Sequence, residues 1–500
     1  MDSAAESYGL RLTKIAASRP DESHLTIVAQ DKVETRVSWR TLETRANQIA
    51  RHFQRLGVGE GSIVALALPS CAEHVMCTLA VWKLGATLLP LRHDQPDWEM
   101  QRMLILAAPA LMVSDAHTAR CPVLSLVDIA STGALPITPL EDRTSEILYL
   151  GASSGSTGQP KLIEVPFRGV VAADHQAQYL GADNTGTALV TSPLYHVNGF
   201  QFASPQLLEG SRVVIMTRFD AALAVDLIER HRVTFCVMVP TMLQRIARLP
   251  DLRVEQFASL RGIVVGGAKT AEWIVDRWMT LVEPGVFSFA YGSTERLGAV
   301  VMSGDEWLTH RGAAGRPQDV ELSIRDSDGC ELPHGEIGDI YMRPVDPTRR
   351  MFRYLGAPTP AATADGYRTL GDLGWLDDDG YLFIADRRTD MIISGGANVF
   401  PAEVEAALSE HPAVADQVVV PVVDADWGHR VHAIVQPVDA TQPPSVDELR
   451  TFCKARLAAY KVPKSFEFVT RVPRTEAGKL NRTALGATVA GLAEPGASAL

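Results

Sequence analysis

The residue types best suited to chemistry gather in short, separated segments of the chain. Glycines, hydroxyls, carboxylates and lysines are the groups that bind and neutralise phosphates, and these segments are rich in them. The segments are SSGSTGQPK at 153–161, YGSTE at 291–295, LGDLG at 370–374, DRRTDMIISGGANVFPAEVE at 386–405 and PRTEAGKLNR at 473–482. Taken singly, each also fits an ordinary turn, linker or solvated loop. The case for phosphate chemistry therefore depends on their combination.

The segment 153–161 combines small residues with hydroxyls and one lysine. Consecutive small residues let backbone N–H groups converge on one anion, and Lys161 adds a positive charge. The hydroxyl groups belong to Ser153, Ser154, Ser156 and Thr157. The segment is not a Walker A loop, because that loop needs Gly-Lys followed by Ser or Thr, and here Pro160 precedes the lysine. A polyphosphate-binding nest and a flexible Gly/Ser loop both remain open.

Two further segments carry carboxylates among small residues, and the first of them ends the strand expected at 287–291. In YGSTE, Tyr291 could stack on a base, the hydroxyls could contact a phosphate, and Glu295 could hold Mg²⁺. In LGDLG, Asp372 stands beside a glycine, where a carboxylate can accept hydrogen bonds from vicinal ribose hydroxyls. A plain turn is the alternative at both places.

Alternating apolar strands and amphipathic helices must position these groups. Strands are predicted at 147–152, 213–216, 235–239, 262–265 and 287–291, and helices at 221–231, 241–249 and 270–282. This alternation is typical of βαβ units, so we expect an α/β fold with sheets covered by helices.

After residue 333 the alternation of strand and helix patterns gives way to hairpin patterns. We expect hairpin strands at 336–342 and 380–384, with DDDG at 377–380 as the turn. A smaller α+β unit follows, with helices at 401–410 and 446–457 and strands at 418–423 and 431–435. The sequence thus predicts a large N-terminal domain, 1–388, and a small C-terminal domain, 389–500, with the boundary near Thr389.

Composition excludes several classes of protein. The 500 residues correspond to roughly three domain-sized units. The 47 Lys and Arg against 59 Asp and Glu give a net charge of −12, which offers no footprint for nucleic acid. The cysteines are scattered without a CxxC pair, and the longest apolar run, 103–113, is too short for a bilayer. A cytoplasmic protein without a secretion signal or membrane span is expected.

The order and composition of the five segments resemble the ANL superfamily of acyl-CoA synthetases, adenylation domains and luciferases. The resemblance extends over about residues 39–482 and implies ATP binding with Mg²⁺, which Glu295 and Ser156 would hold. The ATP-binding residues it implies are Ser153, Ser154, Gly155, Ser156, Thr157, Gly158, Lys161, Gly267, Ala268, Tyr291, Gly292, Ser293, Thr294, Glu295, Asp372 and Arg387. The sequence departs from the family pattern at Asp386, where glycine is usual, and at the hinge position, where Thr389 stands in place of the common Asp or Lys.

The segment PLYHVNGF, 193–200, resembles the family's acyl-binding segment, with His196 between the acyl group and the nucleotide. A histidine satisfied within the core is the alternative. The absence of an acid in this segment argues against an amino-acid substrate. The acyl pocket is expected to include His196, Asn198, Gly199, Gly266, Gly267, Gly298 and Ala299. A bulky terpenoid, steroid or bile acid, or a fatty acid, is the expected acyl group.

The resemblance implies two half-reactions. Lys479 is the catalytic lysine for acyl-AMP formation, and the C-terminal domain then swings about its hinge to place Gly395 and Gly396 beside the thiol of CoA. The chain is therefore expected to be an acid–thiol ligase that makes acyl-CoA. Alternatives are an acyl-AMP ligase that loads a separate carrier protein, a luciferase-like oxygenase and a non-catalytic adenylate-binding regulator. The oligomeric state stays open, with a homodimer among the options.

Overall fold

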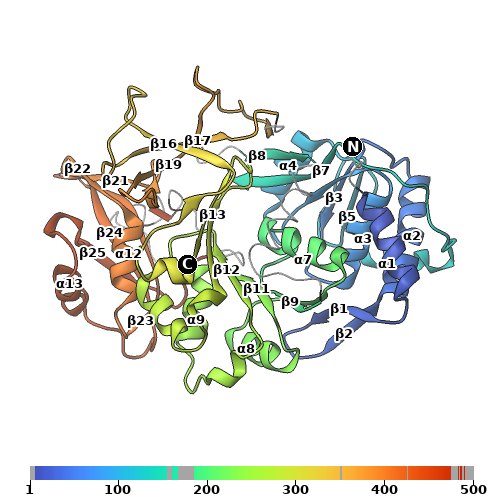
Figure 1. Cartoon of the computed structure of the whole chain (residues 1–500), viewed down its shortest axis with the longest axis horizontal. Helices are drawn as coiled ribbons and strands as arrows, with labels where there is room; N and C mark the ends of the chain where they lie inside the picture. Colours follow the sequence, from blue (N-terminus) through green and yellow to red (C-terminus); the bar gives the residue numbers. More distant parts are fainter. Residues whose placement is uncertain are drawn as a thin grey trace, which may run out of the picture. The chain divides into compact units, whose positions relative to one another are not determined.

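The computed structural model describes residues 6–154, 160–166, 185–348, 352–424 and 426–474, together with residues 482, 485, 486 and 489. Figure 1 shows the helices and strands, coloured along the sequence. The chain divides into two compact units. The first comprises Met1–Gly266, Met279–Ala299 and Pro344–Ala361, and the second comprises Gly267–Trp278, Val300–Arg343 and Ala362–Leu500.

One sheet of the first unit has the strand order β18-β8-β7-β4-β3-β5-β6. Its strands are β3 (Ile63–Ala67), β4 (Thr87–Pro90), β5 (Leu111–Ser114), β6 (Val123–Leu124), β7 (Ile147–Ser154), β8 (Pro160–Pro166) and β18 (Arg353–Leu355). Strand β7 lies parallel to β4, whereas β8 returns antiparallel to β7. The Gly/Ser segment therefore connects two neighbouring antiparallel strands, and the strand predicted for 147–152 is confirmed.

The part of the nine-stranded second sheet that lies in this unit has the strand order β13-β12-β11-β9-β10-β1-β2. Its strands are β1 (Ser23–Val28), β2 (Glu34–Ser38), β9 (Thr187–Val190), β10 (Arg212–Met216), β11 (Phe235–Met238), β12 (Gly262–Gly266) and β13 (Phe287–Gly292). All neighbours are parallel except β1 and β2. Parallel strands need crossover helices, which explains the alternation of strand and helix patterns in this part of the sequence.

Helices supply those crossovers and cover the sheets. They are α1 (Tyr8–Ser18), α2 (Trp39–Arg55), α3 (Ala72–Lys83), α4 (Asp97–Ala107), α5 (Leu126–Ser131), α7 (Val197–Glu209), α8 (Ala221–Arg230) and α9 (Pro240–Ala247), with short 3-10 helices η1 (Thr132–Ala134), η2 (Val254–Phe257) and η3 (Pro284–Val286). Met100, Met103 and Leu104 of α4 pack on Ala65 and Met112 of the first sheet. The Asp220 side chain caps α8, and Pro240 is the first residue of α9.

The second unit contains a sheet of order β16-β17-β19-β20. Elements of this part are α10 (Glu272–Met279), β14 (Ala299–Ser303), α11 (Gly304–Trp307), β15 (Arg316–Pro317), β16 (Val320–Arg325), β17 (Gly338–Pro344), β19 (Arg368–Leu376) and β20 (Leu382–Arg387). The turn at 377–380 is confirmed, but its expected partner strand is wrong: β19, not β17, enters the turn and pairs with β20. The glycines of β19 make its sequence look like that of a loop. However, a Cβ on Gly374 would lie 2.3 Å from the Phe383 carbonyl oxygen, so the close pairing of β19 and β20 requires glycine at this position.

The C-terminal part of the second unit has the strand order β22-β21-β24-β23, with β25 paired to β24. Its elements are β21 (Ile392–Ser394), β22 (Ala397–Val399), α12 (Pro401–Ser409), β23 (Val414–Asp424), β24 (Gly428–Pro437), α13 (Val446–Lys454), η4 (Ala459–Lys461) and β25 (Ser465–Phe468). Val404 and Leu408 of α12 and Leu449 of α13 pack against Val419 and Val431 in a buried core. The helices and strands predicted in this region are confirmed.

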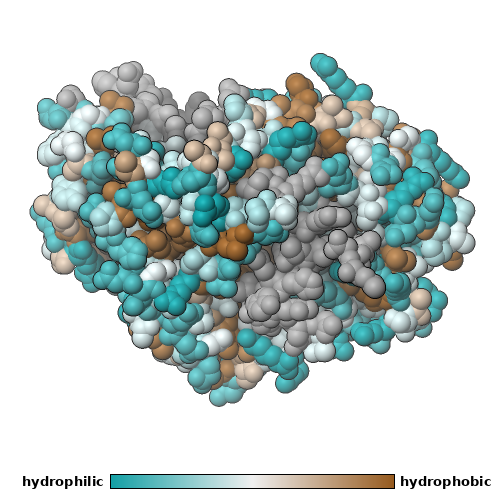
Figure 2. All heavy atoms as spheres, turned by 45° about the horizontal axis from the view of Figure 1, so that its top comes forward, coloured by the Kyte–Doolittle hydropathy of each residue, from teal (hydrophilic) through white to brown (hydrophobic). Residues whose placement is uncertain are grey.

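The face of the molecule drawn in Figure 2 is mostly hydrophilic, with hydrophobic residues in small groups between polar ones. Within the described parts of the chain, no helix combines the length and the apolar character that a bilayer crossing requires.

Candidate active site

A carboxylate, a lysine and a tyrosine meet in the first unit. Tyr354 of β18 donates its hydroxyl hydrogen to Glu295 Oε1 over 2.6 Å. Lys161 Nζ of β8 lies 3.4 Å from the same oxygen and 3.8 Å from the centre of the Tyr354 ring. The Lys161 and Glu295 side chains are only 20% and 11% exposed. We call these three residues the Glu295 cluster; its charges are shielded from solvent, so their electrostatic interaction is stronger than on an open surface.

Strand register and one close approach position this cluster. Ser153 pairs with Lys161 across β7 and β8, so the lysine lies beside the strand that enters the Gly/Ser loop. A Cβ on Gly151 would lie 2.6 Å from Thr294 Cγ2, which means that β7 and the YGSTE loop pack directly together only because residue 151 is glycine. Glu295 therefore lies beside β7 and just after the carboxyl end of β13, the end at which parallel sheets bind ligands.

The ends of β12 and β13 are similarly close. Gly266 pairs with Ala290, and a Cβ on Gly266 would lie 2.9 Å from the Ala290 carbonyl oxygen. Gly292 ends β13, and a Cβ there would lie 3.4 Å from the Gly298 carbonyl oxygen. The Ser293 hydroxyl oxygen is buried and has no hydrogen-bond partner in the described structure. A donor in that position suits a ligand oxygen.

In the second unit, Asp372 and Arg387 lie opposite each other on β19 and β20. Arg387 Nε is 3.2 Å from Asp372 Oδ1, and Asp372 is 8% exposed. Asp386 Oδ2 accepts a hydrogen bond from the Ala402 N–H at 3.0 Å, which caps α12. Burial raises the pKa of the Asp386 carboxyl. The unusual aspartate before Arg387 thus holds the start of α12.

His196 stands at the N-terminus of α7. Its Nδ1 accepts a hydrogen bond from the Asn198 N–H at 3.3 Å, and its backbone begins the helix. Gly199 fits against the preceding loop, because a Cβ there would lie 2.1 Å from the Pro193 carbonyl oxygen. The glycine in PLYHVNGF is therefore required by this tight loop-to-helix contact, and it fixes where the histidine lies.

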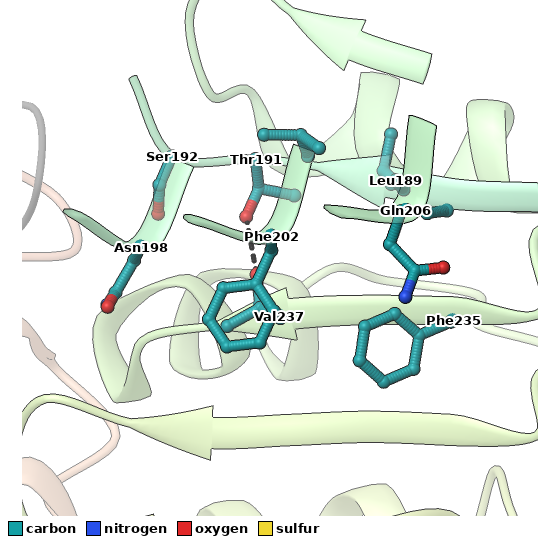
Figure 3. Close-up of a pocket in the computed structure, with 10 residues that line it drawn as sticks. Leu189, Thr191, Ser192, Asn198, Phe202, Gln206, Phe235 and Val237 are labelled. Carbon is teal, nitrogen blue, oxygen red and sulfur yellow. Dashed lines mark hydrogen bonds between the residues drawn. The ribbon is translucent and has the colours of Figure 1, made fainter. Parts of the chain in front are cut away.

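A narrow cavity runs between α7 and strands β9 and β11 (Figure 3). Its walls are Ala188, Leu189, Val190, Thr191, Ser192, Asn198, Phe202, Gln206, Phe235 and Val237. The rings of Phe202 and Phe235 have centroids 6.5 Å apart. The Thr191 hydroxyl donates to the Val237 carbonyl oxygen at 2.9 Å, as Figure 3 shows. The lining is apolar with a few polar groups, which is the usual composition of a small-molecule pocket.

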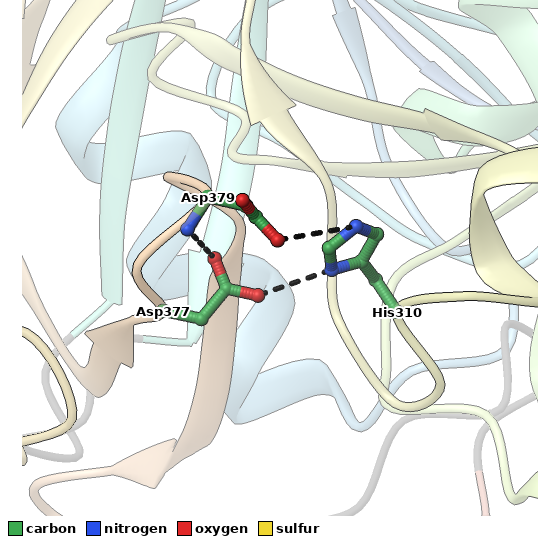
Figure 4. A group of neighbouring side chains, drawn as sticks. All are labelled: His310, Asp377 and Asp379. Atoms are coloured by element: carbon green, nitrogen blue, oxygen red, sulfur yellow. Dashed lines mark hydrogen bonds and ion pairs between the residues drawn. The ribbon is translucent and has the colours of Figure 1, made fainter.

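One cluster of side chains in the second unit has the composition of a metal site. His310, Asp377 and Asp379 lie together (Figure 4). His310 Nδ1 is 3.1 Å from Asp377 Oδ2, while Nε2 is 3.9 Å from Asp379 Oδ2. The two ring nitrogens thus face different carboxylates, and the ring stacks on Tyr381 with centroids 3.6 Å apart. These contacts of His310 stabilise the turn between β19 and β20. We assign no metal ion to the cluster.

Two family models match the chain. The model described as AMP-binding enzyme matches residues 12–348, and the model described as AMP-binding enzyme C-terminal domain matches residues 403–479. The first match covers more than half of the chain. The chain belongs to the AMP-binding enzyme family.

Relatives of this AMP-binding enzyme match nearly full length. A 2-succinylbenzoate–CoA ligase of Bacillus licheniformis is 33% identical over 455 residues, 87% of this chain and 92% of that protein. The fatty acid–[acyl-carrier-protein] ligase ScoC of Streptomyces coeruleorubidus is 35% identical over 482 residues, 90% of this chain and 91% of that protein.

A solved structure is similar over the whole fold. The o-succinylbenzoate CoA synthetase of Bacillus subtilis, in complex with its acyl-adenylate intermediate, has a TM-score of 0.79 and 27% identity and covers 95% of this chain and 97% of its own. A structure of the same enzyme with ATP and a magnesium ion has a TM-score of 0.79 and 28% identity, and covers 95% of this chain and 98% of its own. The expected α/β fold and the expected enzyme class, an AMP-forming acid–thiol ligase, are confirmed.

The structure places some predicted residues of this AMP-binding enzyme and leaves others out. Lys161 meets Glu295 in the first unit, and Asp372 meets Arg387 in the second. Gly267 and Ala268 are exposed residues directly after β12, and Ala299 begins β14. Lys479 and Gly155, Ser156, Thr157 and Gly158 lie outside the described residues, and only the backbone is described at Ser153 and Ser154.

The predictions for the C-terminal domain have a mixed outcome. Gly395 and Gly396 lie between β21 and β22 with φ of +57° and +81°, a turn that only glycine adopts readily. Thr389 lies between the two family matches, the first of which ends at residue 348 and the second of which begins at residue 403. The domain boundary, the hinge, the cytoplasmic location and the oligomeric state stay predictions.

The sequence analysis did not predict two groups of residues at the candidate site. Tyr354 lies in a strand without a motif, and no sequence signal indicates its contact with Glu295. Phe202 and Gln206 follow Asn198 at intervals of four residues, so they lie on the same helical face. That spacing could have identified the cavity wall once α7 was recognised as the helix that begins at His196.

Proposed function

We propose that this AMP-binding enzyme activates a carboxylic acid with ATP and transfers the acyl group to the thiol of CoA. The observation that carries the proposal is the Glu295 cluster. It places a shielded carboxylate and a lysine at the carboxyl end of β13, beside the strand that leads into the Gly/Ser loop. Within this family, such a group suits the binding of a nucleotide triphosphate together with its metal ion.

In the first step, a carboxylate oxygen of the acid attacks the α-phosphorus of ATP. A new bond joins that oxygen to the α-phosphorus, the bond from this phosphorus to the bridging oxygen breaks, and pyrophosphate leaves. Both reactants are anions, so the protein must neutralise charge and hold the two reacting atoms in line. Lys479 bridges the acid and the α-phosphate, while Lys161 and the hydroxyls of the Gly/Ser loop hold the departing pyrophosphate.

The Glu295 carboxylate is suited to hold Mg²⁺, with Ser156 as a second ligand. A hard cation prefers carboxylate and hydroxyl oxygens, and Glu295 is shielded but not sealed from solvent. When bound, the ion neutralises phosphate charge. Tyr354 and Lys161 fix the orientation of the Glu295 carboxylate through its Oε1 atom.

The nucleoside is held by the remaining groups. Asp372 accepts hydrogen bonds from the ribose hydroxyls and Arg387 supports it, as their pairing on β19 and β20 allows. Tyr291 stacks on the adenine, which Gly267 and Ala268 border. His196 stands between the acyl group and the nucleotide.

In the second step, the CoA sulfur attacks the acyl carbon. A carbon–sulfur bond forms, the carbon–oxygen bond to AMP breaks, and the thiol proton is released. The turn at Gly395 and Gly396 guides the thiol after the C-terminal domain rotates about Thr389. The tightness of the turn supports this role, because a Cβ on Gly395 would lie 2.5 Å from the Trp427 ring.

We propose an aromatic acid as the acyl group. The cavity under α7 has room for about one water molecule and is bounded by two phenyl rings, so a flat ring needs less rearrangement to enter than a terpenoid, steroid or bile acid. The ligase of Bacillus licheniformis, named for an aromatic acid, adds support. Polycyclic and fatty acids are the alternatives to test.

The division of labour between the two steps is tested with Lys479→Ala. Acyl-AMP formation, followed as ATP–pyrophosphate exchange, should fall by about a thousandfold because the bridging charge is lost. Thioester formation from supplied acyl-AMP and CoA should stay within about threefold. Equal loss of both steps would refute the assignment of Lys479 to adenylation alone.

A carrier protein is a second candidate acceptor. The 35% identity to ScoC, which is named as a carrier-protein ligase, favours considering it. Supplied acyl-AMP should react with CoA and with a phosphopantetheinylated carrier protein in parallel assays. Faster transfer to the carrier protein would replace CoA in the proposal and leave the adenylation step unchanged.

A further inference from the structure

The cavity under α7 has two chemically different ends. Ser192 and Asn198 lie at the end where β9 finishes and α7 begins, and this is the end nearest His196. Gln206 and Phe235 lie at the other end, where Phe235 pairs with Ala188 at the start of β9 and β11 (Figure 3). The first end therefore receives the carboxylate, and the second receives whatever the acid carries farthest from it.

Gln206 presents a hydrogen-bond donor at this far end. The residue is 1% exposed, and its Oε1 accepts a hydrogen bond from the Ser211 hydroxyl at 3.2 Å. Its Nε2 is buried and has no hydrogen-bond partner in the described part of the chain. A buried amide donor without a partner costs folding free energy, so a ligand atom that accepts from it in this cavity wall would be stabilised.

Thr191, a polar residue of the wall next to Ser192, already has a partner. Thr191 Oγ1 donates to the Val237 carbonyl oxygen. None of the cavity-lining residues is charged. A charged group at the far end would be buried without a counter-ion, which is strongly unfavourable. The acceptor that Gln206 fits is therefore neutral: an ether, a hydroxyl or a carbonyl oxygen.

The stretch of wall between the two ends sets the size of the acid. Asn198 and Gln206 are eight residues apart on α7, which at 1.5 Å per residue spans about 12 Å. Ala188 and Ser192 are four residues apart on the β9 side, which at 3.3 Å per residue spans about 13 Å. Both walls match the length of a cinnamic acid with a para substituent. The empty space has room for about one water molecule, so binding of an aryl ring would require the half-buried Phe202 ring to turn aside.

We propose that Gln206 is the specificity-determining residue that selects aryl acids with a neutral hydrogen-bond acceptor at the para position. The proposal rests on the proposed function, because it assigns this cavity to the acyl group. An acid without the acceptor leaves the amide donor unpaired, and sites built around a hydrogen bond discriminate strongly against such analogues.

The test compares 4-methoxycinnamate with 4-methylcinnamate, which have similar shapes, by ATP–pyrophosphate exchange. The unaltered enzyme should prefer the methoxy acid about tenfold in kcat/KM. Gln206→Met removes the donor and keeps the unbranched side chain, so the ratio should fall to about one, mainly because the methyl acid improves. Gln244→Met, the same change at a buried residue of α9 outside the cavity lining, should keep the tenfold ratio.

The outcomes separate the inference from the function on which it depends. A ratio near one in the unaltered enzyme, or equal loss with both acids in Gln206→Met, would overturn the role of Gln206 and assign its amide to a buried water. Exchange with other acids but with neither cinnamate would instead overturn the aryl substrate. If Gln206→Met does not fold, Ser211→Ala frees the amide to rotate and should lower the ratio about threefold; an unchanged ratio would also count against the inference.

Discussion

The Glu295 cluster and the cavity under α7 lie in the same unit but are built on opposite principles. In the cluster, each polar group is charged or is bound to a charge, and one oxygen of Glu295 takes both Tyr354 and Lys161. In the cavity, the lining is uncharged, and the amide nitrogen of Gln206 is left without a partner in the described structure.

This difference separates the chemistry from the choice of substrate. Charge stabilisation at the phosphates is needed whichever acid is activated, so damage to the cluster should affect all acids equally. Packing and one hydrogen bond in a neutral cavity change relative rates only, so damage there should reorder the acids. If variants of the cluster and of the cavity changed kcat/KM for the panel of acids in the same way, the two regions would not have separate roles.

The largest effect is expected for Glu295→Gln. The change removes the negative charge that we propose holds the metal ion, so kcat/KM for ATP–pyrophosphate exchange should fall by about 100- to 1000-fold with every acid. The matched control is Glu164→Gln on β8, whose carboxylate accepts from Arg353 at 2.9 Å on the surface. The Arg353 side chain of this ion pair is exposed, so loss of the pair should change kcat/KM for the exchange by less than about threefold. A loss restricted to some acids would contradict the assignment of Glu295.

A smaller and selective effect is expected for Phe202→Ala. Removing the ring that narrows the cavity should raise kcat/KM for polycyclic acids about tenfold relative to cinnamates, because the space between α7 and Phe235 widens. The measurement is exchange with both classes of acid at saturating ATP. A uniform loss across the panel, with the same unfolding temperature as the unaltered enzyme, would place the acyl group elsewhere.

The smallest effect is expected for Thr191→Val. The variant loses the hydrogen bond to the Val237 carbonyl oxygen, so the free energy of unfolding should fall by about 1 kcal/mol in urea titrations. The preference for the methoxy over the methyl acid should stay within about twofold, because this hydroxyl is already paired within the protein. A larger change in preference than Gln206→Met produces would show that the wrong polar group had been chosen.

The polar site was more accessible from sequence than the cavity. Consecutive small residues and an isolated carboxylate leave a signature in sequence, which predicted Lys161, Glu295 and Asp372, while Arg387 was predicted from the family resemblance. The structure brings Lys161 to Glu295 and Asp372 to Arg387. The β19 strand was missed because its glycines mimic a loop, although Gly374 is demanded by the close approach of β20. Tyr354 and Gln206 were missed because their roles depend on contacts made only in three dimensions.

The central claim, that this enzyme adenylates an aryl acid, is tested most directly by ATP–pyrophosphate exchange against a panel of acids. The panel comprises acetate, long fatty acids, para-substituted cinnamates and polycyclic acids, each with the unaltered enzyme and with Glu295→Gln. The account predicts exchange with the para-substituted cinnamates that is lost in Glu295→Gln. Silence with every acid, while ATP is shown to bind, would contradict it.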